Sequence, residues 1–124
     1  AGLREAAPET TIKLFNTARS DKNDVITEIF KSKAILVGSP TINRGILTGI
    51  AALLEEIKGL KFKGKKAAVF GCYGWSGEGN KVLSENLHTA GFEVVGDGFK
   101  ALWNPDDSAK AAAAAFGRQI AEAL

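Results

Sequence analysis

The feature that most constrains the fold is an apolar run followed at once by a glycine-rich stretch. Residues 67–70 are continuously apolar, and residues 71–79 read Gly-Cys-Tyr-Gly-Trp-Ser-Gly-Glu-Gly. Such an apolar run is typical of a buried strand, and the glycines allow a sharp turn or a close backbone approach. Because open α/β sheets bind ligands at the carboxyl ends of their strands, the aromatic residues Tyr73 and Trp75 favour a site for a flat ligand. The alternative is a strand-to-helix turn whose aromatic side chains cover the edge of the core.

A second loop of polar character follows another apolar run, residues 34–38. Its residues are Ser39, Pro40, Thr41, Ile42, Asn43, Arg44 and Gly45. Hydroxyl groups, a proline and an asparagine provide fixed hydrogen-bonding groups at the end of a strand. Loops after two successive parallel strands lie on the same edge of the sheet, so we expect the two loops to form a cleft that suits a planar heterocycle.

Helix and strand patterns alternate along the whole chain, without a linker or a repeat. The patterns predict strands over 11–15, 34–38, 66–70 and 92–102, and the last strand is interrupted by Gly96-Asp97-Gly98. They predict helices over 20–31, 46–58, 80–89 and 105–124, with Ser20 as the N-cap of the first of these. Residues 1–7 resemble the last turns of a further helix. This alternation predicts one α/β domain over residues 1–124, an open parallel sheet between helices in a three-layer sandwich.

Composition excludes several classes of function. The 124 residues are enough for one core, and a net charge of +2 with scattered cations argues against a nucleic-acid surface. No apolar run approaches the ~18 residues of a membrane span and no signal peptide is present, so we expect a cytoplasmic protein. With one cysteine and one histidine, the chain has no disulfide and no multi-cysteine metal site. No nucleophile–base pair or paired acid and base suggests catalysis of its own.

The order of these motifs resembles a known family. The chain has, in order, a strand, Gly-Ser-Pro-Thr-x-Asn (38–43), a helix, a strand, Phe-Gly-x-x-Gly-Trp-Ser-Gly-Glu (70–78) and a further helix. This order is similar to the carboxyl-terminal flavodoxin-like domain of the A-type flavoproteins. These are the flavo-diiron proteins, among them the flavorubredoxins and the rubredoxin:oxygen oxidoreductases. The likeness extends from about residue 12 to the end of the chain.

The resemblance implies that the chain binds FMN and transfers electrons. One side of the flavin pocket would be formed by Ser39, Pro40, Thr41, Ile42 and Asn43. The other would be formed by Cys72, Tyr73, Gly74, Trp75, Ser76 and Gly77, with Cys72 contributing its backbone or an edge contact. No catalytic and no metal-binding residue is expected. The partner would be a redox protein or a diiron domain, to which this chain delivers electrons.

One part of the family pattern is absent from the chain. In the flavodoxin-like strand order 2-1-3-4-5, the first strand and its phosphate-binding loop should precede residue 1. We therefore expect an amino-terminally incomplete domain that binds FMN loosely and is either self-associated or disordered before about residue 17. The alternative is a flavodoxin-like fold without flavin that acts as a protein-interaction module. A receiver-like signalling domain is disfavoured, because Ser39 rather than Asp follows the 34–38 strand.

Overall fold

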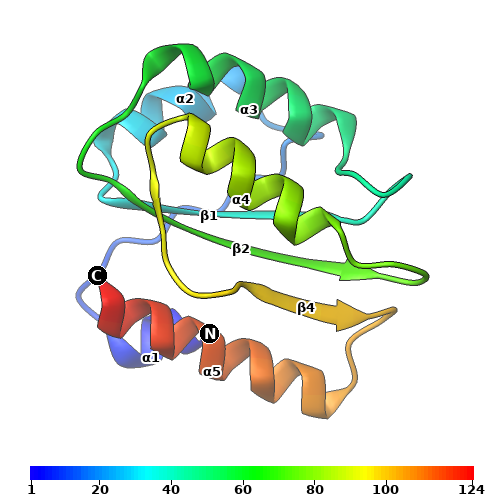
Figure 1. Ribbon diagram of the computed structural model, residues 1–124. Helices are drawn as coiled ribbons and strands as arrows, with labels where there is room; N and C mark the ends of the chain where they lie inside the picture. The colour runs from blue at the N-terminus through cyan, green and yellow to red at the C-terminus, as the bar shows by residue number, and fades with distance from the viewer.

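A computed structural model describes all 124 residues and shows three layers (Figure 1). Its elements are α1 (Gly2–Ala6), α2 (Lys22–Lys31), β1 (Ala34–Pro40), α3 (Thr48–Leu60), β2 (Lys66–Tyr73), α4 (Gly79–Thr89), β3 (Glu93–Val94), β4 (Phe99–Leu102) and α5 (Asp107–Ala123). Helices α2, α3 and α4 cover one face of the sheet, and α1 and α5 cover the other. The predicted α/β sandwich is confirmed.

The sheet is parallel throughout and has β2 at its centre. Strand β1 pairs with β2 in a register that runs from Ala34 opposite Lys66 to Pro40 opposite Cys72. On the other side, β3 and then β4 both pair with β2, and the break between them is at Gly96 and Gly98. Both glycines have positive φ, 68° and 82°. The predicted parallel neighbours and the predicted interruption are therefore confirmed.

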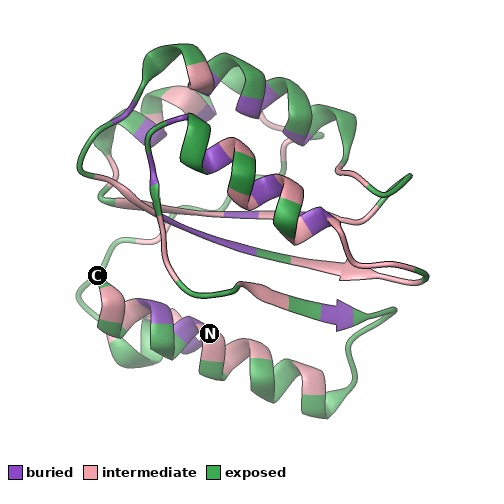
Figure 2. Cartoon of the chain, viewed as in Figure 1, coloured by how far each residue is buried: buried purple, intermediate pink, exposed green.

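The main core lies between the sheet and the layer of α2, α3 and α4 (Figure 2). Leu54, Ile57, Leu83 and Leu87 are fully buried there. Their spacing of three and four residues places each pair on one face of its helix. The second face carries a smaller apolar contact, in which Ile120 of α5 is buried. The core thus fixes the strands whose ends carry the two loops.

The prediction of a strand over residues 11–15 is wrong. This segment is irregular and donates no backbone hydrogen bond, and Leu14 is 92% exposed. A segment with alternating apolar residues forms a half-buried strand only where a neighbouring strand supplies the hydrogen bonds of a ladder. No strand pairs with the segment, and β1 itself is paired on one side only. Lys13 instead forms a 2.9 Å ion pair with Glu28 of α2.

Helix boundaries differ from the predicted ones by one or two residues. The N-cap of α2 is Asp21 rather than Ser20, since the Asp21 Oδ1 accepts hydrogen bonds from the amides of Asn23 (2.8 Å) and Asp24 (3.3 Å). Helix α5 begins after Asp106, whose carboxylate caps the Ala109 amide at 2.7 Å. In both helices the capping carboxylate also complements the positive end of the helix dipole, which the Ser20 hydroxyl would not do at α2.

Candidate functional site

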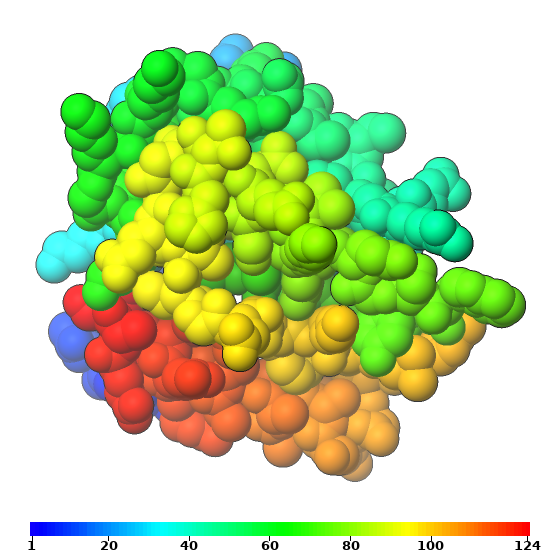
Figure 3. All heavy atoms as spheres, viewed as in Figure 1, coloured from blue at the N-terminus to red at the C-terminus, as the bar shows by residue number.

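Two loops lie side by side at the carboxyl edge of the sheet (Figure 3). They follow β1 and β2, whose last residues are in register. The link between the loops is Thr41: its amide donates to the carbonyl of Cys72 at 2.8 Å, and its Oγ1 accepts from the amide of Gly79 at 3.1 Å. Thr41 therefore ties the first loop both to the end of β2 and to the start of α4.

The first loop is a tight turn at residues 42–45. The backbones of Ile42 and Gly45 exchange two hydrogen bonds, of 3.1 and 2.8 Å. Between them, Asn43 and Arg44 both have positive φ, 51° and 60°. Two successive positive φ values are typical of a type I′ turn, which Asn accepts easily and Arg does not. The tip of this loop is therefore fixed and carries a cation.

A buried hydroxyl holds the base of the first loop. Ser39 is 4% exposed, and its Oγ donates to the carbonyl of Pro40 at 2.8 Å and accepts from the amide of Leu47 at 3.0 Å. These two bonds satisfy the hydroxyl inside the protein. Ser39 therefore shapes the loop from beneath rather than facing the space between the loops.

The second loop presents aromatic side chains. Trp75 is 97% exposed at its tip, whereas Tyr73 is half-buried. The ammonium of Lys100 lies 5.4 Å from the centre of the Tyr73 ring, which is within cation–π range. The indole face of Trp75 is therefore open to stacking by another planar group.

A cavity of about 200 Å³ separates the two loops. It is lined by Thr41, Asn43, Arg44, Trp75 and Ser76. The structure thus brings together four residues that the sequence predicts for one site, two from each loop. The fifth residue, Arg44, was missed, although a cation next to the turn-forming Asn43 could have indicated it.

The other predicted site residues lie around this cavity rather than in its wall. Pro40 and Cys72 pair at the ends of their strands, and Ile42 is 41% exposed in the turn. Gly74 contacts the indole of Trp103, which the sequence analysis also missed. Gly77 faces a different cavity.

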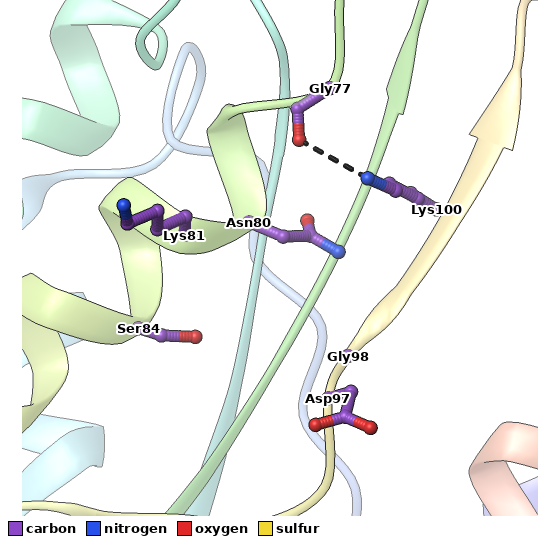
Figure 4. Close-up of a pocket in the computed structure, with 7 residues that line it drawn as sticks. All are labelled: Gly77, Asn80, Lys81, Ser84, Asp97, Gly98 and Lys100. Carbon is purple, nitrogen blue, oxygen red and sulfur yellow. Dashed lines mark hydrogen bonds between the residues drawn. The ribbon is translucent and has the colours of Figure 1, made fainter.

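That second cavity, of about 400 Å³, lies between α4 and β4 (Figure 4). Its lining is polar: Gly77, Asn80, Lys81, Ser84, Asp97, Gly98 and Lys100. The Lys100 ammonium donates to the Gly77 carbonyl at 3.5 Å, and the Asn80 amide donates to the Phe99 carbonyl at 3.0 Å. These contacts connect β4 to the second loop and to α4.

Glu78, at the end of the second loop and directly before α4, has a perturbed pKa. The pKa of Glu78 is held below its ordinary value, first by hydrogen bonding from the Ser76 side chain, then by its own amide and the charges of Arg44 and Lys100. One of its oxygens, Oε2, is shielded from solvent and has no hydrogen-bond partner. The cation of the first loop, Arg44, and a cation of β4, Lys100, therefore both act on one anion at the base of the aromatic loop.

The chain lacks a metal-ligating cluster and a membrane-spanning helix. No three His, Cys, Asp or Glu residues come together where they could hold a metal ion. None of the helices has the length and the apolar composition to span a membrane.

Comparison with known proteins gives a consistent result. The flavodoxin family profile matches residues 1–117. The anaerobic nitric oxide reductase flavorubredoxin of Aeromonas hydrophila is 44% identical over 120 residues, which are 97% of this chain and 24% of that protein.

Solved structures agree with the sequence match. The rubredoxin oxygen:oxidoreductase of Desulfovibrio gigas superimposes with a TM-score of 0.89 at 35% identity, over 98% of this chain and 31% of that one. The flavodiiron protein of Giardia intestinalis gives a TM-score of 0.84 at 26% identity, over 98% and 31% of the two chains. The chain therefore spans about a quarter to a third of the length of these relatives.

Proposed function

The chain belongs to the flavodoxin family, and we propose that it binds FMN between its two loops and passes electrons from it to a metal centre on another domain or protein. The observation that carries the proposal is the cavity lined by Thr41, Asn43, Trp75 and Ser76, at the carboxyl edge of a parallel sheet in this family's fold. Bound FMN would supply one- and two-electron redox chemistry.

The residues of the cavity fit a flavin ring. Trp75 offers an exposed indole face on which a planar ring can stack. Asn43 and Ser76 supply short polar groups of the kind that hydrogen-bond to the edge of a heterocycle. Arg44 adds a positive charge at the rim, which favours an anionic ligand or a ring that gains negative charge on reduction.

The chain's own residues would then have separable roles. Trp75 would cover one face of the ring and exclude water from it. Thr41 would keep the two loops at a fixed separation through its bonds to Cys72 and Gly79. Glu78, held ionised by its neighbours, would set the local charge beneath the second loop. Hydrogen bonds and charges around a flavin are the means by which a protein tunes its reduction potential.

The proposed partner is a diiron domain or a small redox protein. Support comes from the relatives, which are flavorubredoxin, flavodiiron protein and rubredoxin oxygen:oxidoreductase, each three to four times longer than this chain. The chain brings together no metal-ligating cluster of its own, so we assign it the electron-delivering role. Pairing of the free edge of β1 with a second copy is a further proposed contact.

Titration with FMN tests the proposal. We expect saturable quenching of flavin fluorescence by the purified protein. Trp75→Ala should weaken binding by about two- to tenfold, because aromatic stacking contributes ~0.5–1.5 kcal/mol. Leu14→Ala is a matched control, since Leu14 is also more than nine-tenths exposed but lies far along the chain in the 11–16 segment. A parent protein that does not bind FMN would favour the alternative, a flavin-free interaction module.

A further inference from the structure

Trp103 occupies a strained and exposed position at the end of β4. Its amide donates to the Tyr73 carbonyl at 2.8 Å, one residue beyond the last pair of the β2–β4 ladder, Tyr73 with Leu102. Its φ is 54°, in the left-handed region that bulky residues rarely adopt. The side chain remains 71% exposed. Core burial therefore does not explain why a tryptophan stands here.

The indole of Trp103 packs directly on the backbone of Gly74. A Cβ atom added at Gly74 would lie 2.8 Å from both Cζ2 and Cη2 of the indole, closer than real Cβ contacts come. Gly74 is not among the residues with positive φ. The backbone conformation thus does not require glycine at this position; instead, the indole occupies the space that a Cβ atom would take, so an added methyl group would displace it.

The contact lies immediately before Trp75. On the same strand, Lys100 reaches the Tyr73 ring and the Gly77 carbonyl, so β4 holds the second loop on both sides of Gly74. Trp75 itself is 97% exposed, and its direction depends on how the backbone before it is held. We propose that Trp103 is a positioning residue: seated on Gly74, it fixes the direction in which Trp75 leaves β2 and so presents the Trp75 indole to the flavin ring. The inference rests on the proposed function.

The first experiment compares Trp103→Ala with Trp103→Phe. The chain has two tryptophans, so in both variants Trp75 is the only one and its fluorescence anisotropy decay reports the motion of the loop without any ligand. We expect a larger fast component in W103A than in W103F. FMN binding should weaken about tenfold in W103A, equivalent to 1.4 kcal/mol, and recover in W103F. Leu102→Ala, at a neighbouring exposed apolar position, should leave the FMN affinity unchanged.

The second experiment removes the contact from the opposite side. In the parent chain, Gly74→Ala would force the indole away, and we expect the same loss of FMN affinity as in W103A. In the W103A background the added methyl group has room, so G74A should cause little further loss. This non-additivity is the signature of a direct contact, and an independent effect of either residue on stability would not produce it.

The outcomes separate the inference from the proposed function. Equal FMN affinity of the parent and W103A, or additive losses for W103A and G74A, would overturn the positioning role. If the parent chain binds no FMN, the proposed function fails, and the anisotropy decay alone tests whether Trp103 orders the second loop. Equal decays in W103A and W103F overturn that ordering, and a faster decay in W103A supports it.

Discussion

The register of β1 and β2 predicts that two glycine-to-alanine substitutions, one residue apart in the ladder, differ sharply in effect. Gly71 lies opposite Ser39, and Gly38 lies opposite Phe70. A Cβ at Gly71 would fall well inside 3.0 Å of the Ser39 carbonyl oxygen, a backbone atom. A Cβ at Gly38 would fall equally close to the ring of Phe70, a side chain that is 40% exposed.

The expected losses of stability depend on whether the atoms that meet the new methyl group can move away. In Gly71→Ala the strands must separate by about 1 Å before ordinary contact is restored, and a close-packed interior resists such a shift. We expect a loss near the upper end of the range for overpacking, about 2–3 kcal/mol of the free energy of unfolding. In Gly38→Ala the Phe70 ring can rotate into solvent. Its cost should stay below about 1 kcal/mol, partly offset by the reduced entropy of the unfolded chain.

Urea denaturation followed by circular dichroism measures both free energies on one scale. G71A should also weaken FMN binding, because Ser39 holds the base of the first loop through the Leu47 amide. G38A should bind FMN as the parent does. Equal stabilities of G71A and G38A would show that the Ser39 carbonyl does not approach Gly71 as closely as the register of β1 and β2 places it.

Three further predictions concern the core, the charge at the site and the sheet edge. Leu54→Ala, at a fully buried position of α3, should lower the free energy of unfolding by about 2–5 kcal/mol, and a loss under 1 kcal/mol would contradict the assigned core. The pKa of Glu78 is lowered in the folded state, so the contribution of its carboxylate to stability is present above the ordinary pKa of 4.5 and is lost as the pH falls through the folded-state pKa. The difference in melting temperature between Glu78→Gln and the parent should therefore shrink below pH 4.5. A difference that stays constant with pH would refute the lowered pKa. Within these 124 residues β1 is paired on one side only, so sedimentation of a protein of these 124 residues should depend on its concentration, and a single concentration-independent species would count against edge pairing.

The parallel sheet and the neighbouring loops could be predicted because they follow from local pattern. A short apolar strand, a helix and a second apolar strand can connect in few ways, so residues 34–38 and 66–70 had to pair in parallel. Once they pair, Thr41 and Trp75 must emerge at one edge, where the structure has them. The position of the candidate site therefore followed from the fold.

What could not be predicted depends on partners that are distant in sequence. The alternation at residues 11–15 is a property of the segment alone, but a strand also needs a neighbour, and none pairs there. Likewise, Trp103 lies one residue beyond the predicted 92–102 strand, and only the structure shows its left-handed φ and its contact with Gly74. Arg44 sits in a local turn set by the bonds between Ile42 and Gly45, but only the structure shows that this turn brings Arg44 into one cavity with Trp75 and Ser76 of the second loop.

The docking of α1 on α5 has a consequence for the order of folding. Arg118 of α5 forms a 2.8 Å ion pair with Glu5 of α1, across 113 residues of sequence. Contacts this distant close the longest loop in the chain, and their entropic cost is recovered only when the rest of the domain is in place. Helix α1 packs mainly on α5. It should therefore dock last and open first, so that its amides exchange with solvent long before those of β2, while the two loops at the other end of the strands remain assembled.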